Sequence, residues 1–341
     1  MRCSFSVLVS KSLIALLSPI IVSISLACDV KPSIMLDGAD VIFAVDTKFE
    51  LDPEHSYIAV FGDLQTYTMG RFIEYYQKSC EWIRGQYDSG IRICSILAVG
   101  DITQNNTPEQ WLAFKTASDT VSSVIPFYVC PGNHDYSWSS SKIYDRSNTR
   151  INAFAHFPIT DEGIIEYYED NDLSNYVAKT NVRPNLLLLS LEFAPREDVL
   201  DWATDYVEKN PDKGFILMTH EWLTGDGERV VSDSDSELQL EGYSSYTLPE
   251  YIWRQLVSPN NNILCVLCGH NGFSASIFTT NEFGRPVPQI LFNLQSVTHG
   301  GSGLIQILEF ESDYSTVNVF IYDTINNRVY DSDVASFPYA F

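Results

Sequence analysis

Apolar runs alternate with amphipathic segments through the first half of the chain. Short runs at Tyr57–Phe61, Ile93–Val99 and Ile125–Cys130 predict buried strands, because each is rich in apolar residues and bounded by polar ones. Helices are expected over about Gly70–Arg84 and Pro108–Ser123, which separate these runs. Strands that alternate with helices at this spacing are typical of parallel βαβ units.

The start of the second predicted helix carries a clear signal. Thr107 is suited to the N-cap, Pro108 to the first helical position, and Gln110 completes a capping box. We therefore expect this helix to begin at Pro108.

The second half of the chain is predicted to be richer in strands. Further strands are expected at Leu186–Glu192, Gly214–Met218 and Ile263–Cys268, with a helix over about Asp198–Lys209. The C-terminal part then changes character, because its strand-like runs are joined by short polar connections that are typical of antiparallel hairpins. These runs are Gln289–Leu294, Gly303–Phe310, Thr316–Tyr322 and Asn327–Tyr330. An α/β fold with two mixed sheets packed face to face and helices outside follows from this order.

No shift in composition marks a domain boundary after Cys28, so we expect a single domain over residues 28–341. Within it, residues 28–56 form a lead-in and linker. Their one strand-like run, Val41–Val45, is expected to be an edge strand or a leading strand.

Polar residues follow five of the predicted strands. In chain order these residues are Asp63, Asp101, Asn133, His220 and His270. Open α/β sheets bind ligands at the carboxyl ends of their strands, so the five side chains can converge on one crevice. Carboxylate, amide and imidazole groups are metal ligands, and we interpret the crevice as a metal site.

The N-terminal segment resembles a targeting sequence. Arg2 and Lys11 precede an uncharged, mostly apolar run from Ser12 to Ala27, which ends in small residues. We expect residues 1–27 to be a signal peptide and the chain to be exported, to a periplasmic or cell-surface location or to the medium. Cys28 directly after the cut leaves two fates open: a lipid anchor on Cys28, which would attach the protein to a membrane, or plain cleavage and secretion.

Charge and cysteine content narrow the function classes. The formal net charge is -23, which disfavours binding to nucleic acid because such binding relies on Lys and Arg. Cys265 and Cys268 have the spacing of a zinc pair, but within one strand they face opposite sides of the sheet. We expect both to be buried thiols.

The order of the motifs resembles the calcineurin-like metallophosphoesterase superfamily. The motifs are Gly62-Asp63-Leu64-Gln65, Gly100-Asp101, Gly132-Asn133-His134-Asp135, His220 and Gly269-His270, and the similarity covers about Tyr57–Phe310. Within this superfamily, the chain is similar to a secreted or lipoprotein-type subgroup whose first motif reads Asp-x-Gln. This resemblance implies a four-layer αββα sandwich and a metal-dependent phosphoesterase.

The resemblance also implies how the ligands divide between two divalent metal ions. Asp101 would lie between the two metals, with Asn133, His220 and His270 completing the second site. Mixed oxygen and imidazole ligands suit Mn, Fe or Zn better than Ca. We therefore expect one or two divalent metal ions as cofactors.

The first metal site departs from the pattern of the family. Asp63 is present, but Gln65 replaces a histidine, and Gly272 stands where the last motif carries another histidine. Gln65 still offers an amide oxygen, and His299 is a possible extra ligand. An unrelated role for His299 is the alternative.

The third motif, which contains His134 and Asp135, is expected to supply the general acid of the reaction. His134 would donate a proton to the leaving oxygen, and Asp135 would orient His134 or raise its basicity. Both are predicted to be catalytic residues.

Our leading hypothesis is an exported enzyme that hydrolyses a small-molecule phosphoester with a metal-activated water. One alternative is a catalytically weak surface binding protein on a phosphoesterase scaffold, and another is a phosphodiesterase that acts on lipid headgroups or nucleotides. The loop Thr224–Gly242 is expected to be exposed beside the site. Nearby aromatic residues would either stack on a base or sugar or pack in the core; they are Tyr136, Trp138, Trp222 and Tyr243.

Overall fold

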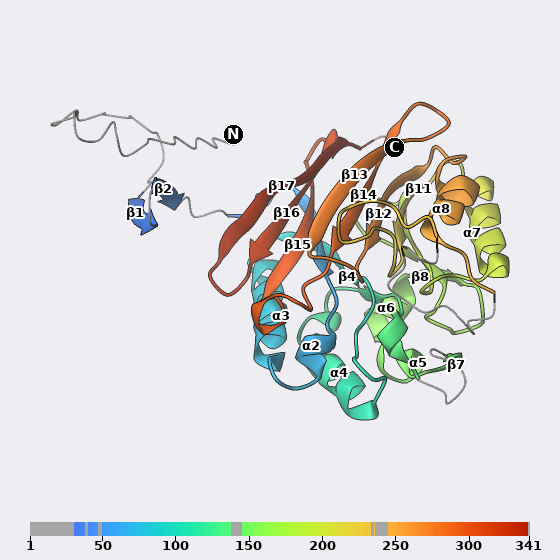
Figure 1. Cartoon of the computed structure of the whole chain (residues 1–341), viewed down its shortest axis with the longest axis horizontal. Coiled ribbons are helices and arrows are strands. Elements are labelled where there is room, and N and C mark those ends of the chain that lie inside the picture. The colour runs from blue at the N-terminus through green and yellow to red at the C-terminus, as the bar shows by residue number, and fades with distance from the viewer. Residues whose placement is uncertain are drawn as a thin grey trace. The chain divides into compact units, whose positions relative to one another are not determined.

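A computed structural model describes residues 31–37, 40–46, 50–137, 145–232, 235 and 245–339. The chain forms two compact units that divide between Glu50 and Leu51 (Figure 1). In the first unit, β1 (Lys31–Asp37) pairs antiparallel with β2 (Asp40–Asp46). The strand expected at Val41–Val45 therefore exists within β2, and β1 is its partner. The predicted signal peptide lies outside the described residues.

The second unit is built on two large mixed sheets (Figure 1). One has the order β17-β16-β15-β3-β4-β5, and the other has the order β13-β14-β12-β11-β10-β9-β8. The strands of the first are β3 (Ser56–Phe61), β4 (Arg92–Ala98), β5 (Phe127–Val129), β15 (Leu304–Phe310), β16 (Thr316–Asp323) and β17 (Arg328–Pro338). Those of the second are β8 (Ile164–Tyr167), β9 (Tyr176–Lys179), β10 (Leu186–Ser190), β11 (Gly214–Met218), β12 (Ile263–Cys268), β13 (Ser274–Thr280) and β14 (Pro286–Phe292). A small sheet pairs β6 (Tyr136–Ser137) with β7 (Asp145–Thr149).

The helices cover the outer faces of the sheets (Figure 1). They are α2 (Gln65–Thr68), α3 (Ile73–Asp88), α4 (Pro108–Ser122), α5 (Ile151–Phe154), α6 (Pro158–Gly163), α7 (Glu197–Lys209) and α8 (Pro249–Ile252), with short turns η1 (Asn133–Asp135), η2 (Trp253–Val257) and η3 (Thr298–Gly300). α7 buries Leu200 and Val207 in one hydrophobic core with Leu187 and Leu217 of the seven-stranded sheet. The predicted four-layer αββα arrangement is confirmed.

The predicted capping of α4 is also confirmed. Thr107 is the N-cap, and its side chain accepts a hydrogen bond from the backbone N–H of Gln110. Pro108 begins the helix as expected. None of the helices in the described part of the chain is long and apolar enough to cross a membrane.

The two sheets are held to each other by direct contacts between their strands. On β9 and β5, the hydroxyl of Tyr176 donates to the carbonyl of Val129 at 2.7 Å. On β13 and β17, the hydroxyl of Ser276 donates to the carbonyl of Val334 at 2.6 Å. Both layers therefore belong to one rigid core that fixes the strand ends.

One predicted pairing is wrong. The run Gln289–Leu294 was expected to form an antiparallel hairpin with the C-terminal strands, but β14 pairs parallel with β12 in the other sheet. β13, which the sequence did not predict, supplies its antiparallel neighbour. The expected hairpins of β15, β16 and β17 are present.

Candidate metal centre

The five predicted ligands follow strands that lie side by side. β3, β4 and β5 are parallel neighbours in one sheet, and β11 and β12 are parallel neighbours in the other. Asp63, Asp101 and Asn133 follow the first three, and His220 and His270 follow the last two. Because parallel neighbours end at the same edge, each sheet presents its ligands at its carboxyl end.

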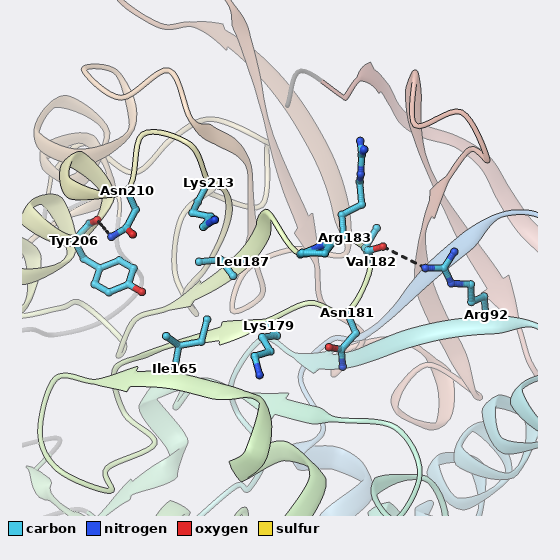
Figure 2. A pocket seen from close by; sticks show the side chains of 11 residues that line it. Arg92, Ile165, Lys179, Asn181, Val182, Arg183, Leu187, Tyr206, Asn210 and Lys213 are labelled. Atoms are coloured by element: carbon cyan, nitrogen blue, oxygen red, sulfur yellow. Dashed lines mark hydrogen bonds between the residues drawn. The ribbon is translucent and has the colours of Figure 1, made fainter.

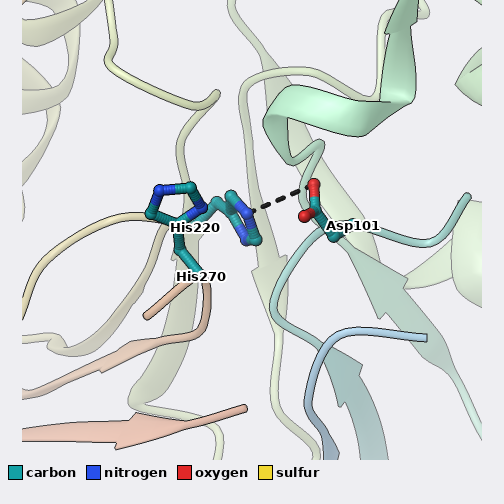
Figure 3. A group of neighbouring side chains, drawn as sticks. All are labelled: Asp101, His220 and His270. Atoms are coloured by element: carbon teal, nitrogen blue, oxygen red, sulfur yellow. Dashed lines mark ion pairs between the residues drawn. The ribbon is translucent and has the colours of Figure 1, made fainter. Parts of the chain in front are cut away.

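The group on the second metal side is assembled as predicted. Ligand atoms of Asp101, His220 and His270 all lie within 4.8 Å of one another, and all three residues are buried (Figure 3). Nε2 of His220 lies 3.2 Å from Oδ1 of Asp101 and 3.1 Å from Oδ1 of Asn133. The four side chains thus form the half-site that the sequence predicted.

The tautomer of His220 follows from its backbone contact. Nδ1 of His220 lies 2.7 Å from the carbonyl oxygen of Val99, which can only accept a hydrogen bond. Nδ1 therefore carries a proton, and the lone pair of the neutral ring is on Nε2. That lone pair points to the oxygens of Asp101 and Asn133, so three electron donors meet at one place, as a cation requires.

The glycines before Asp101 and Asn133 each make room for another ligand. A Cβ at Gly100 would lie 2.4 Å from Nδ1 of His220, and the φ angle of Gly100 is +100°. A Cβ at Gly132 would lie 2.2 Å from Oδ1 of Asp101. Gly100 is therefore needed for the approach of His220 from the other sheet, and Gly132 for the approach of the neighbouring loop that carries Asp101.

Burial and mutual charge set the protonation of this pair. Burial favours neutral Asp101, but the charge of His220 outweighs it and holds the pKa of Asp101 well below its usual range. Burial alone would lower the pKa of His220, yet the carboxylate of Asp101 raises it to about 10. Burial and then repulsion from His220 lower the pKa of His270 to about 3.

Three buried atoms at the centre fit a cation. Oδ2 of Asp63, Oε1 of Gln65 and Nε2 of His270 have no hydrogen-bond partner within the described part of the chain. Burial raises the pKa of Asp63 to about 8, so its carboxyl group is costly to ionise without a positive charge beside it. Divalent cations at the two metal positions would satisfy these atoms, His270 at the second and Asp63 and Gln65 at the first, and the donor groups present therefore fit the metal that the motifs imply.

The backbone around Gly272 leaves no room for the histidine that the family's last motif carries at this position. Gly272 has a φ angle of +60°, and a Cβ there would lie 2.8 Å from Cα of Gly225. The segment after β11 therefore takes the space into which a side chain at position 272 would begin. An imidazole at this position is incompatible with the conformation of the chain.

His299 packs against aromatic side chains, and its role as an extra ligand stays a prediction. Its ring is stacked on Tyr75 with centroids 5.4 Å apart and packs edge-on to Phe72 at 5.0 Å. The residue is exposed in the left-handed turn η3, with a φ of 55°. These contacts hold His299 against the start of α3.

His134 is positioned through its backbone and through its ring, whose Nδ1 also lies 3.1 Å from the side-chain Nε2 of Gln104. Its backbone N–H donates to Oδ1 of Asp101 at 2.9 Å, and Nδ1 of its half-buried ring lies 2.8 Å from the carbonyl oxygen of Gln104. Nε2 is therefore the ring atom that can hold a transferable proton. Gln104, three residues after Asp101, belongs to none of the sequence motifs.

Asp135 has a different role from the one expected. Its carboxylate accepts hydrogen bonds from the backbone N–H groups of Ile102, Thr103 and Gly132 at 2.8 to 3.0 Å, and from the hydroxyl of Thr103 at 2.9 Å. It thus fastens the loop of Asp101 to the loop of Asn133. The described contact that orients the ring of His134 comes from Gln104, not from Asp135.

Two residues beside the centre belong to none of the sequence motifs. Glu221 is buried, and its Oε1 lies 3.7 Å from Nε2 of His270. Phe193 packs its ring against His220 and His270, with centroids 5.9 Å apart in each case. Neither could be found from motif spacing, because Phe193 comes from a loop after β10 that carries no motif.

Two of the four aromatic residues expected near the site lie within the described part of the chain. Trp222 is fully buried, and its ring N–H donates to Oε1 of Gln289 at 2.8 Å. Tyr136 is buried in a small core with Phe193. Both therefore pack in the core, whereas Trp138 and Tyr243 lie outside the described residues, as does much of the loop Thr224–Gly242.

The predicted buried thiols are confirmed. Cys265 and Cys268 are free and buried on β12. Burial raises the pKa of each thiol above its ordinary value, to about 12 for Cys265, so neither is a thiolate at neutral pH.

A separate cavity of ≈ 590 Å³ lies at the other ends of the strands (Figure 2). Its lining includes four basic residues, Arg92, Lys179, Arg183 and Lys213. Arg92 begins β4 and Lys213 precedes β11, the strands whose carboxyl ends carry Asp101 and His220. The cavity is therefore remote from the metal centre. Two of its basic side chains have partners nearby, because Arg183 stacks on Tyr314 and Lys213 pairs with Asp212.

Two proteins resemble the chain in sequence. Uncharacterized protein YvnB of Bacillus subtilis (strain 168) is 24% identical over 76% of this chain and 19% of its own length. A probable glycerophosphodiester phosphodiesterase, GpdQ of Arcobacter nitrofigilis, is 23% identical over 51% of this chain and 55% of its own length. The chain thus spans about a fifth and about half of these two relatives.

Among solved structures, the NAD nucleotidase of Haemophilus influenzae matches 75% of this chain and 47% of its own, with 10% identity and a TM-score of 0.38. The model of the calcineurin-like phosphoesterase family matches residues 56–272, from β3 to just past His270. This match covers more than half of the chain and includes all five strand-end ligands. The chain belongs to the calcineurin-like phosphoesterase family.

Proposed function

We propose that the chain is an exported enzyme that hydrolyses a phosphate ester at a centre of one or two divalent metal ions. The observation that carries the proposal is the convergence of Asp101, Asn133 and His220 within 3.2 Å contacts, with His270 beside them. Family membership supports hydrolysis of phosphate esters as the reaction class.

The residues divide the work at such a centre. Asp101, Asn133, His220 and His270 would hold one metal ion, and Asp63 and Gln65 would hold the other with Asp101. Divalent metal ions supply charge neutralisation for the phosphoryl oxygens and lower the pKa of a water molecule. Mn, Fe and Zn suit this donor set.

His134 would deliver the proton that the leaving oxygen needs. The carbonyl of Gln104 holds Nδ1, so the proton is transferred from Nε2. Asp135 contributes indirectly, because its hydrogen bonds keep the loops of Asp101 and Asn133 in place. The ring of Phe193 beside His220 and His270 keeps one side of the centre apolar, which strengthens charge interactions there.

A phosphodiester is the substrate class we favour for the first assays. The relative GpdQ is described as a probable glycerophosphodiester phosphodiesterase, and it matches half of this chain. Paired assays of an aryl phosphate monoester and the corresponding diester, each with Mn²⁺, Zn²⁺, Fe²⁺ or Mg²⁺, test this choice. A higher kcat/KM for the monoester with every metal would contradict it.

The decisive experiment for hydrolysis is Asp101→Asn. This change removes the charge shared by the two metal positions, and we expect loss of hydrolysis of an aryl phosphate ester by about 100-fold or more. Asp119→Asn is the control, because Asp119 is an exposed residue of α4. Full activity of the Asp101 variant would refute the role of this residue.

A binding protein on the same scaffold is the second candidate. The observation in its favour is the first metal position, where Gln65 replaces an imidazole and Gly225 fills the space beside Gly272. Purified protein that holds metal but turns over no ester in a broad panel of monoesters and diesters would favour binding over catalysis.

Export also belongs to the proposal, with Arg2, Lys11 and the apolar run up to Ala27 as its support. Mass spectrometry of the mature protein tests it and separates the two fates of Cys28. An acylated Cys28 indicates a membrane anchor, an unmodified Cys28 at the N-terminus indicates secretion, and a retained Met1 contradicts cleavage.

A further inference from the structure

Glu221 is a buried acidic residue that neither the motifs nor the family resemblance assigns. It follows His220 directly, and only 3% of its surface is exposed. Its Oε1 lies 3.7 Å from Nε2 of His270. A third carboxylate, beside those of Asp63 and Asp101, is thus present at the centre.

The distance between Glu221 and His270 suits a shared cation better than a hydrogen bond. An N–H···O hydrogen bond spans about 2.7 to 3.2 Å, and Nε2 of His270 has no hydrogen-bond partner within the described part of the chain. Two atoms that each bind one cation at about 2.1 Å are roughly 3.0 to 3.6 Å apart for ordinary coordination angles. The observed separation is close to the upper end of this range.

His270 also connects Glu221 to the first metal position. Its backbone N–H donates to Oδ1 of Asp63 at 3.1 Å, while its ring faces Glu221. Oδ2 of Asp63 and Oε1 of Gln65 are buried and have no hydrogen-bond partner among the residues described. Buried oxygens without a partner are costly, and a cation would satisfy both.

We propose that Glu221 is a ligand of the metal centre beside His270 and adds a carboxylate oxygen that favours a hard divalent cation such as Mn²⁺ or Mg²⁺. The proposal rests on the metal centre of the proposed function. It assigns a carboxylate to a centre that has lost two imidazoles, at positions 65 and 272.

The change from imidazole nitrogen to oxygen donors predicts which metal ions the centre prefers. Imidazole suits Zn and Fe, whereas carboxylate and amide oxygens suit Mg²⁺ and Mn²⁺. An amide at position 65 and the added carboxylate of Glu221 therefore move the centre toward hard cations. The added negative charge also attracts a divalent ion into a buried position.

The test is the affinity for Mn²⁺, measured from the electron paramagnetic resonance signal of the free ion. Glu221→Gln preserves size but removes the charge, and we expect it to weaken Mn²⁺ binding about tenfold or more. Glu228→Gln is the matched control, because Glu228 is exposed seven residues further along the chain. It should bind Mn²⁺ as the unaltered protein does.

The variant Asp101→Asn distinguishes a failure of the proposal for Glu221 from a failure of the metal centre itself. If Asp101→Asn weakens Mn²⁺ binding but Glu221→Gln stays within twofold of the unaltered protein, Glu221 is no ligand and the metal centre stands. If Asp101→Asn also leaves binding unchanged, the metal centre fails and the proposal for Glu221 fails with it.

Metal selectivity gives a second readout that does not depend on activity. After dialysis against equimolar Mn²⁺ and Zn²⁺, the ratio of bound Mn to Zn should fall in Glu221→Gln relative to Glu228→Gln. An unchanged ratio would overturn the proposal. Should Glu221→Gln not fold, Glu221→Asp keeps the charge on a shorter chain and is expected to retain Mn in preference to Zn; loss of that preference would overturn it.

Discussion

Nε2 of His220 lies 3.2 Å from Oδ1 of Asp101, and both side chains are buried between the carboxyl ends of the two sheets. One residue follows β11 and the other follows β4. The pair therefore links the two halves of the sandwich. Each member determines the charge of the other, because burial alone would leave both groups neutral.

Removal of this pair should destabilise the metal-free protein in a pH-dependent way. Asp101→Asn leaves His220 buried without its counter-charge, and we expect a loss of about 3 kcal/mol in the free energy of unfolding at pH 6. The folded pKa of His220 is raised to about 10, so the pair stabilises fully below the unfolded value of about 6.5 and loses its effect as the pH rises toward 10. Urea unfolding with a chelator at pH 6 and pH 9.5 checks this. An equal loss at both pH values would contradict it.

Metal uptake should release protons. At pH 7 Asp63, with a pKa of about 8, and His220, with a pKa of about 10, both hold a proton in the metal-free protein. A cation needs both lone pairs, so binding should release about two protons at pH 7, and affinity should rise with pH. Calorimetry in two buffers of different ionisation enthalpy measures the number, and Asp63→Asn should reduce it to about one. Proton-neutral binding would rule out this protonation state.

A histidine introduced at position 65 should have a different effect from a histidine introduced at position 272. Oε1 of Gln65 is buried without a hydrogen-bond partner among the described residues, so Gln65→His places a nitrogen donor where one is needed. We expect Zn²⁺ affinity to rise about tenfold, because imidazole suits zinc. Competition with a chromogenic chelator measures the affinity. A decrease would show that the helix α2 does not direct this side chain to the metal.

Gly272→His should fail for a steric reason. Its Cβ would meet Cα of Gly225 at 2.8 Å, and a φ of +60° strains a residue with a side chain. We expect a loss of about 2 kcal/mol or more in the free energy of unfolding and no gain in metal affinity. A stable variant with tighter zinc binding would contradict the structure of this turn.

The ligands could be predicted from the sequence because each lies two to four residues after a strongly apolar strand. Asp101, Asn133 and His220 owe their convergence to the parallel order of their strands, which alternating patterns reveal. The weak strands were missed for the opposite reason. β8 and β13 lie at the edges of a sheet and contain no fully buried residue, so their sequences lack a buried apolar run.

Roles that depend on tertiary contacts could not be predicted. Asp135 follows His134 in the chain, and adjacency suggested that it acts on that ring, yet its oxygens turn to the backbone of the neighbouring loop. Glu221 faces His270, which is 49 positions away in the numbering of the sequence. His299 lies in a Gly-rich turn near the site in sequence order, but aromatic stacking holds it on α3.

Asp135→Asn should act on stability before it acts on chemistry. The carboxylate accepts four hydrogen bonds, and an amide would turn N–H groups toward some of these donors. We expect a loss of about 3 kcal/mol in the free energy of unfolding, since buried donors are left without acceptors. Denaturant titration measures it. A variant as stable as the unaltered protein but inactive would restore a direct catalytic role for Asp135.

His134→Gln should act on chemistry without a large effect on stability, because its half-buried ring makes few contacts. A general acid contributes about 100-fold or more when the leaving group is a poor one. We therefore expect kcat to fall by about that factor for an ester of an alcohol. For an ester of an acidic phenol the fall should be much smaller, because that leaving group departs without a proton. The ratio of the two effects is the measurement. Asp119→Asn, at an exposed position of α4, is the control that should leave this ratio unchanged. Equal losses on both esters would assign His134 to binding of the phosphate rather than to proton transfer.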